Sequence, residues 1–256
     1  MRILTIETAT RALRVAIIEG PATIEETGSA ADRLLVHRET DGLRAHGHDL
    51  PLLVEGALKS AHLSLKQLDG VVVDIGPGSF AGLRIGVAYA KGLAMGAGLP
   101  IATVCSLDVI AANAPKDEEA AICSLLDAKQ QKVYFARYVF RGPREYRQSP
   151  ALLTIEEVIT RCAGAATHHF LGDGITPYRE VLTAALGDRA QFAPETQWYP
   201  RVEMAAHMGI VAFRAGKRSN PKTLVPMYLY PWDCSIKGGQ GTTETLPQPP
   251  HIEVRS

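Results

Sequence analysis

The chain has 256 residues, of which 46% are hydrophobic and 21% charged, and this composition excludes a disordered protein. Its 27 Lys and Arg residues balance 27 Asp and Glu residues, so bulk positive charge does not support nucleic-acid binding by the chain alone, although a local basic patch stays open. The four cysteines form no C-x-x-C pair, which predicts isolated reduced side chains rather than a disulfide framework or a zinc ribbon.

The N-terminal sequence and the apolar runs bear on location. Residues 1–7 lack the apolar segment of a signal peptide, and no apolar run approaches the about 18 residues of a membrane span. We therefore expect a cytoplasmic protein with no membrane contact.

The first half of the chain alternates between strand and helix patterns. Short apolar or alternating runs predict strands, and apolar residues at helical spacing predict helices. We expect His48 or Asp49 to cap the first helix and Ser106 to cap the third. In chain order the predicted elements are strands over 2–7, 12–18 and 31–38, a helix over 51–63, a strand over 71–75, a helix over 80–97, a strand over 100–104 and a helix over 107–113.

The second half repeats this order. Thr154 and Glu157 have the spacing of a capping box, which marks a helix start. The predicted elements are a strand over 120–126, a turn over 127–131, a strand over 132–140, a helix from 154, a strand over 168–171 and helices over 176–186 and 201–216.

The duplicated element order predicts an α/β protein of two similar lobes, each a mixed sheet flanked by helices, with a ligand cleft between them. We assign residues 1–104, joined by the helix at about 201–216, to the N-terminal lobe and residues 105–200 to the C-terminal lobe. Residues 236–256 are rich in Gly, Thr and Pro and are expected to form a flexible tail.

The run from Gly76 to Gly86 is the most informative motif. Glycines after a buried strand permit a tight turn, and the amides that begin the next helix can hold an anion. The run is neither a Walker loop nor a dinucleotide fingerprint, because the Gly-Lys-Ser/Thr ending and the later acidic residue are missing. A strand-to-helix turn without a ligand is an equal alternative.

Small residues share one face of the helix that follows. Gly82, Gly86 and Ala90 are four residues apart, and each helical glycine costs about 1 kcal/mol relative to alanine. Something therefore approaches this face closely. The sequence leaves open whether this is the protein's own sheet or a helix of a partner.

Two hairpin turns are candidates for a phosphate-binding pair across the cleft. The first, Glu7 to Thr10, offers the hydroxyls of Thr8 and Thr10, whereas the second, Asp127 to Gln131, contains no glycine. We therefore do not expect independent ATP hydrolysis.

The sequence contains no metal-binding or nucleophile motif. The eight histidines form neither an H-x-x-x-H nor an H-E-x-x-H pattern, so no metal site is expected. Ser79 and Ser106 follow strands, but no G-x-S-x-G elbow surrounds them.

Several segments carry a family resemblance that covers about residues 1–232. They are Met1–Thr10, the Gly76–Gly86 run with Ala90–Ala94, Leu126–Lys129 with Val133–Ala136, Gly172–Gly174 and Pro226–Leu229. Together they resemble the TsaB (YeaZ) family of threonylcarbamoyladenosine synthesis on tRNA. The stretch 27–39 and the tail 236–256 depart from the family pattern.

The resemblance implies a duplicated actin/Hsp70-like (ASKHA, ribonuclease H-like) fold and a non-catalytic homologue of TsaD. TsaD carries an H-x-x-x-H metal site on the helix after the strand that corresponds to 100–104, and this chain has Ser106 and Ile110 there. Family members pair with TsaD through two helices of the N-terminal lobe, here about 50–62 and 80–97. The ATPase TsaE and tRNA complete the assembly.

We expect two sets of site residues, with no catalytic residue and no metal ligand: the resemblance implies the first set, and the turns described above suggest the second. The partner-binding candidates are Leu52, Glu55, Lys59, Gly82, Ile85, Gly86, Tyr89, Ala90 and Leu93. The cleft candidates for a nucleotide are Glu7, Thr8, Thr10, Gly76, Gly78, Ser79, Asp127, Gly172 and Gly174. No intrinsic cofactor is expected, and ATP or ADP would bind at the interface of the complex.

Three functions follow as hypotheses. The first is a subunit required for threonylcarbamoyladenosine at the adenosine next to the anticodon of tRNAs that read codons beginning with A, acting by binding and activating TsaD. The second is a glycoprotease-like peptidase, which needs a nucleophile with a base, or a metal. The third is an independent nucleotide-binding regulatory module or a homodimer, since exposed apolar helix faces favour self-association.

Overall fold

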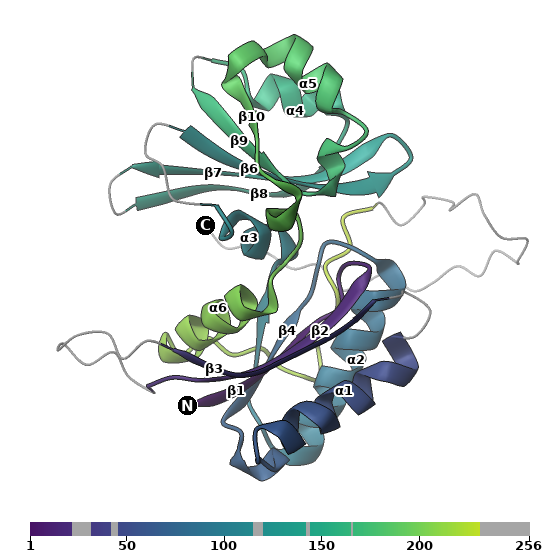
Figure 1. Cartoon of the computed structure of the whole chain (residues 1–256), viewed down its shortest axis with the longest axis vertical. Coiled ribbons are helices and arrows are strands. Elements are labelled where there is room, and N and C mark those ends of the chain that lie inside the picture. The colour runs from purple at the N-terminus through teal and green to yellow at the C-terminus, as the bar shows by residue number, and fades with distance from the viewer. Residues whose placement is uncertain (22–31, 42–45, 115–119, 142–143, 165, 231–256) are drawn as a thin grey trace, which may run out of the picture.

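The computed structural model describes residues 1–21, 32–41, 46–114, 120–141, 144–164 and 166–230, in two lobes that each contain a five-stranded mixed sheet (Figure 1). Both sheets have the same plan. Three strands that follow one another in the sequence pair antiparallel. A fourth strand pairs parallel with the first of them, and a fifth pairs parallel with the fourth. The predicted duplication is confirmed.

The N-terminal lobe is built on the sheet β3-β2-β1-β4-β5. Its strands are β1 (Arg2–Glu7), β2 (Ala12–Glu19), β3 (Arg33–Asp41), β4 (Gly70–Asp74) and β5 (Ile101–Val104). All residues of β4 are buried, as a central parallel strand covered on both faces requires.

Helices cover both faces of this sheet. α1 (His46–Ser60) and α2 (Phe80–Ala97) lie on one face, where they pack against Leu4, Ile6 and the residues of β4 that share their side. α6 (Val202–Arg214) packs on the other face against Ile3 and Val72. Alternate residues of β1 and β4 thus form two separate cores.

The C-terminal lobe repeats the plan with the order β10-β9-β6-β7-β8. Its strands are β6 (Ala120–Lys129), β7 (Lys132–Arg141), β8 (Arg144–Leu153), β9 (Thr167–Leu171) and β10 (Ala190–Phe192). α4 (Ile155–Arg161) and α5 (Arg179–Leu186) lie on the outer face, and α3 (Ser106–Ala111) packs on the face turned toward the other lobe (Figure 1). Short 3-10 turns occur at Leu65–Gln67, Asp173–Ile175, Gly187–Arg189 and Glu195–Gln197.

Two predicted helix starts in the N-terminal half are wrong. α1 begins at His46, so His48 and Asp49 lie inside the helix, where their side chains hydrogen-bond at 2.9 Å. Pro51 lies inside the helix as well, although proline favours the first turn. Cys105 precedes α3, and Ser106 is its first helical residue rather than its cap.

The C-terminal half differs from the prediction at its ends and edges. The hairpin strand β6 continues to Lys129, so the turn is shorter than 127–131. A 3-10 turn occupies the start of the predicted 176–186 helix, and α5 begins at Arg179. The edge strands β8 and β10 were not predicted.

The structure describes part of the unusual stretch 27–39 but not the tail at 236–256. The tail and residues 27–31 lie outside the described residues, whereas residues 33–39 of the stretch belong to the edge strand β3. None of the described helices combines the length and the hydropathy needed to cross a bilayer.

Candidate functional site

Glu7, the last residue of β1, stabilises the first hairpin turn, between β1 and β2. The Glu7 carboxylate is fully buried and accepts hydrogen bonds from the Ala9 amide at 2.7 Å and the Arg14 guanidinium at 2.9 Å. Burial raises the pKa of Glu7, and the charge of Arg14 opposes this rise. The carboxylate occupies an amide donor that a bound phosphate would need.

The turn at Gly76–Ser79 packs directly on this hairpin. The Ser79 amide donates to the Ala9 carbonyl at 2.7 Å, and a side chain at Gly78 would overlap the same carbonyl. The Ser79 hydroxyl accepts from the Gly82 amide at 3.2 Å as the N-cap of α2. These contacts show that Gly78 and Ser79 serve the packing of the turn on the hairpin.

The small-residue face of α2 meets the protein's own hairpin. A Cβ at Gly82 would overlap the Thr8 carbonyl oxygen, and a Cβ at Gly86 would overlap the Thr8 hydroxyl. Ala90 is fully buried on the same side. The close approach is therefore internal, and the prediction that Gly82, Gly86 and Ala90 face a partner is wrong.

Asp74 ends β4 in a closed polar cluster. Its Oδ1 accepts from the Gly76 amide at 2.7 Å and from the Ser106 hydroxyl at 2.8 Å, while Oδ2 is buried with no hydrogen-bond partner in the described part of the chain. Burial, followed by the charge of Glu7, raises the pKa of Asp74 well above its usual range. Ser106 thus supports the turn, and Ile110 beyond it is buried in the core.

The cleft candidates of the C-terminal lobe also make internal contacts. The Asp127 amide donates to the Asp173 carboxylate at 2.9 Å. Gly172 has a φ of +112° and passes so close to the Leu125 carbonyl that a side chain would overlap it, and Gly174 packs on the same residue. These glycines are required by close packing within the lobe.

Tyr199 lies between β10 and α6, in the segment that joins the lobes. Burial, followed by the charge of Asp173 in the C-terminal lobe, raises the pKa of Tyr199, whereas the charge of Arg11 in the N-terminal lobe lowers it. Its backbone carbonyl accepts from Asn113 at 2.9 Å. The interlobe region therefore contains a chain segment and its own hydrogen bonds.

The remaining partner-binding candidates lie on the outside of α1 and α2. Leu52 is 55% exposed, and the exposed Glu55 and Lys59 form an ion pair of 2.6 Å. Tyr89 of α2 is half-buried against the core beneath both helices, and burial, followed by the charge of Glu55, raises its pKa. Ile85 and Leu93 are half-buried at the junction of the two helices.

A second stripe of small residues on α2 was not predicted. Ala88, Gly92 and Gly96 are also four residues apart, but they are exposed, and a Cβ at Gly92 or Gly96 would meet nothing within 4 Å. Met95 beside them is 55% exposed. The four-residue spacing that singled out Gly82 could have identified this stripe too.

We define the α1–α2 face by ten exposed or half-buried residues of these two helices (Figure 1). They are Leu52, Glu55, Lys59, Ile85, Ala88, Tyr89, Gly92, Leu93, Met95 and Gly96. The far flank of α2 is fixed by the chain near residue 228, because Lys91 donates to the Leu224 carbonyl at 2.8 Å and Arg84 to the Tyr228 hydroxyl at 3.1 Å.

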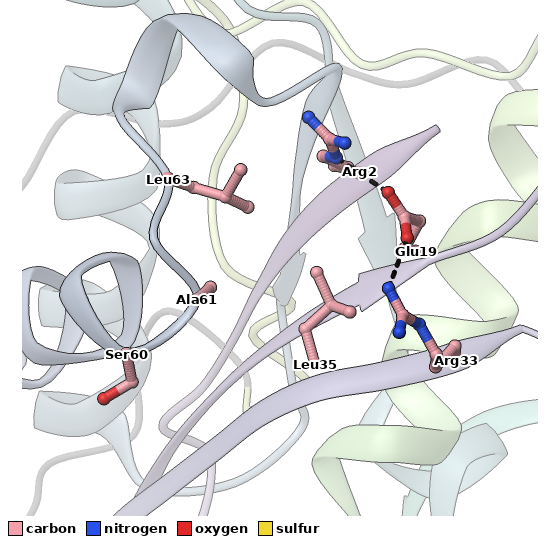
Figure 2. A pocket seen from close by; sticks show the side chains of 7 residues that line it. All are labelled: Arg2, Glu19, Arg33, Leu35, Ser60, Ala61 and Leu63. Atoms are coloured by element: carbon pink, nitrogen blue, oxygen red, sulfur yellow. Dashed lines mark hydrogen bonds and ion pairs between the residues drawn. The ribbon is translucent and has the colours of Figure 1, made fainter.

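Two cavities lie at the edges of the N-terminal lobe, away from the predicted cleft. One of about 270 Å³ is lined by Arg2, Glu19, Arg33, Leu35, Ser60, Ala61 and Leu63 (Figure 2). Its cations are already paired, because Glu19 bonds both arginines at 2.8 Å. The other, of about 400 Å³, lies beside Leu52, between β3 and α1. Neither is lined by the cleft candidates.

The duplicated sheets and the placement of their helices define the class of protein. Two lobes of the same strand order, each with helices on both faces, make this an actin/Hsp70-like (ASKHA) protein. The solved structure of YeaZ from Pseudomonas aeruginosa has the same fold, with a TM-score of 0.71 at 24% identity over 89% of this chain and 99% of that chain.

The family follows from the sequence comparison. The family model described as "TsaD: tRNA N6-adenosine threonylcarbamoyltransferase" matches residues 36–228, well over half of the chain. The chain belongs to this family, as a member of its TsaB (YeaZ) group.

Curated relatives match over different lengths. The TsaB protein of Bacillus subtilis is 27% identical over 90% of this chain and 94% of its own length, and that of Escherichia coli is 35% identical over 54% and 55%. Both are called tRNA threonylcarbamoyladenosine biosynthesis proteins. An uncharacterized protein of Mycobacterium tuberculosis is 37% identical over 53% of this chain and 58% of its own length, so the chain spans little more than half of that relative.

Proposed function

We propose that this chain is the non-catalytic subunit that binds and activates TsaD in threonylcarbamoyladenosine synthesis, next to the anticodon of tRNAs that read codons beginning with A. TsaE and the tRNA take part through the complex, which works in the cytoplasm. The observation that carries the proposal is the exposed stripe Ala88–Gly92–Gly96 on the α1–α2 face. Family membership and the names of the relatives support it.

The glycines of the exposed stripe lower the stability of α2, and no contact in the described chain compensates for this loss. Each helical glycine costs about 1 kcal/mol relative to alanine. At Gly82 and Gly86 the hairpin beneath uses the space, but at Gly92 and Gly96 nothing in the described chain does. A partner helix that approaches closely at this stripe would use it, while the neighbouring Leu52 and Met95 supply apolar area.

The non-catalytic part of the proposal rests on the start of α3. Ser106 and Ile110 are buried in internal contacts, so this helix offers no imidazole where the resemblance places the metal site of TsaD. The chemistry then belongs to TsaD. The peptidase alternative has no such support: in the part of the chain that the structure describes, the hydroxyls of Ser79 and Ser106 bond the Gly82 amide and Asp74 and no histidine.

We further propose that the chain has no intrinsic nucleotide site and that ATP or ADP binds at the interface of the complex. The Ala9 and Ser79 amides, the donors that a phosphate would need, are bonded to Glu7 and to the Ala9 carbonyl. Without TsaD, the apolar α1–α2 face pairs two copies of this chain.

Reconstitution tests the proposal. TsaD, TsaE, ATP, threonine, bicarbonate, the enzyme that forms the threonylcarbamoyl adenylate and an unmodified tRNA are combined with and without this chain, and modified adenosine is measured by mass spectrometry. We expect modification to depend on the chain. Equal modification in its absence would reject the proposal.

A matched pair of variants locates the surface. Leu52 and Val181 are both exposed, at 55% and 44%, but Val181 lies on α5 of the other lobe. Leu52→Glu should lower modification at least tenfold, and Val181→Glu should leave it unchanged. Equal effects of both variants would remove the α1–α2 face from the account.

A further inference from the structure

A cluster of thiol and imidazole groups lies in the core of the C-terminal lobe, far from the α1–α2 face. Cys123 is on β6, Cys162 is the C-cap of α4, and His168 is on β9 beside β6 (Figure 1). All three are fully buried. Among the described residues, they form the group of metal-ligand type whose donor atoms lie within 4.8 Å of one another.

The distances fit a shared metal ion. The two sulfurs are 4.0 Å apart, and the Cys123 sulfur is 3.9 Å from Nδ1 of His168. With the bond lengths of zinc, about 2.3 Å to sulfur and about 2.0–2.1 Å to nitrogen, a planar trigonal metal ion holds two sulfurs about 4.0 Å apart and a sulfur and a nitrogen about 3.8 Å apart.

The imidazole is oriented for this role. Nε2 of His168 lies 2.9 Å from the Cys162 carbonyl, which can only accept, so Nε2 carries the proton. In the neutral ring the lone pair is then on Nδ1, the atom that faces Cys123. A second ring nitrogen bonded to a backbone carbonyl is the usual support of a metal-ligating histidine.

The charges and ligand number select the kind of metal. Arg137 pairs with Cys123 across β6 and β7, and its Nε is buried with no hydrogen-bond partner among the described residues. Two thiolates and one monovalent ion leave a charge of −1, which the guanidiniums of Arg137 and Arg189, both close enough to act on Cys162 and His168, offset. Structural zinc normally has four protein ligands, and soft thiolates also select Cu(I).

We propose that Cys123, Cys162 and His168 form a buried three-coordinate site for a soft monovalent metal ion, Cu(I). The ion joins the end of α4 to the sheet and stabilises the C-terminal lobe. The spacing of these residues matches no sequence motif, which is why a metal site was not expected from the sequence.

Metal titration of the full chain tests the site. The reduced apoprotein, with Cys234→Ser to remove the cysteine that lies outside the described residues, is titrated anaerobically with Cu(I) against a chromophoric chelator, and separately with Zn²⁺. We expect one equivalent of Cu(I), an X-ray absorption spectrum with two sulfurs and one nitrogen, and a higher Tm of the loaded protein. No Cu(I) uptake, or tighter uptake of Zn²⁺ than of Cu(I), would overturn the proposal.

Matched alanine variants assign the ligands. Cys162→Ala should weaken Cu(I) binding more than about a hundredfold, since even the loss of a supporting group costs 10–100-fold. Cys105→Ala, at another buried cysteine, should bind as before. Circular dichroism checks the folding of each variant. The X-ray absorption spectrum is recorded on the protein with all three ligands in place, so it tests the site even if a variant fails to fold. Unchanged affinity in Cys162→Ala, or a Cys123–Cys162 disulfide in place of bound metal, would contradict the site.

Discussion

The two small-residue stripes of α2 respond in opposite ways to one substitution. Gly82→Ala places a Cβ into the Thr8 backbone carbonyl, which cannot rotate away, and within 3.2–3.3 Å of the Ser79 side chain. Overpacking of this kind costs about 1–3 kcal/mol. The gain in helix propensity from glycine to alanine is smaller near a helix end, so it offsets only part of this cost. Gly92→Ala meets open space, so it keeps the full propensity gain of about 0.5–1 kcal/mol.

Urea unfolding of the isolated chain measures both changes. We expect Gly82→Ala to lower the free energy of unfolding by about 1–3 kcal/mol and Gly92→Ala to raise it by about 0.5–1 kcal/mol. Gly86→Ala should fall between them, because its Cβ meets the side chain of Thr8 rather than the backbone. A neutral Gly82→Ala or a destabilising Gly92→Ala would refute the assignment of the inner and outer stripes.

Three further predictions concern buried polar groups and a cap. Burial raises the pKa of Asp74, so its neutral form contributes stability that is full below about pH 4 and is lost as the pH rises through the folded pKa. In urea unfolding, the free energy of unfolding of Asp74→Asn should therefore rise relative to that of the wild type as the pH rises. A difference that stays constant with pH would contradict this. Arg14→Met leaves the Glu7 carboxylate buried and unpaired and should cost about 3–5 kcal/mol, much of it restored by adding Glu7→Gln; no restoration would argue against the pair. Thr154→Ala removes a capping box and should cost about 1 kcal/mol in the same assay, whereas no loss would show that the cap is redundant.

The sequence predicted best where local chemistry decides the structure. The bounds of α2 were correct because Ser79 caps its start and Gly98, in the left-handed conformation, ends it. The start of α4 followed from its capping box. The edge strand β8 was missed because Arg144–Leu153 contains Pro150 and many polar residues, and its pairing with β7 is a tertiary effect.

The candidate site was predicted less well because it depends on what lies opposite each residue. Helical spacing showed that Gly82 and Gly86 share a face, but only the packing shows that Thr8 fills the space there. The cleft candidates stay a prediction, and what the sequence could not show is that the Ala9 amide bonds Glu7 and the Ser79 amide bonds the Ala9 carbonyl. Similarly, Cys123 and His168 meet only because β9 pairs beside β6.

Direct binding to TsaD tests the central claim that the outer stripe of α2 is a docking surface. Isothermal titration of purified TsaD should give a 1:1 complex with the wild type and at least tenfold weaker binding with Gly92→Leu, whose side chain projects from the exposed stripe. Ala184→Leu, which adds the same bulk at an exposed position on α5, should bind like the wild type. Equal affinity of Gly92→Leu and wild type would contradict the account.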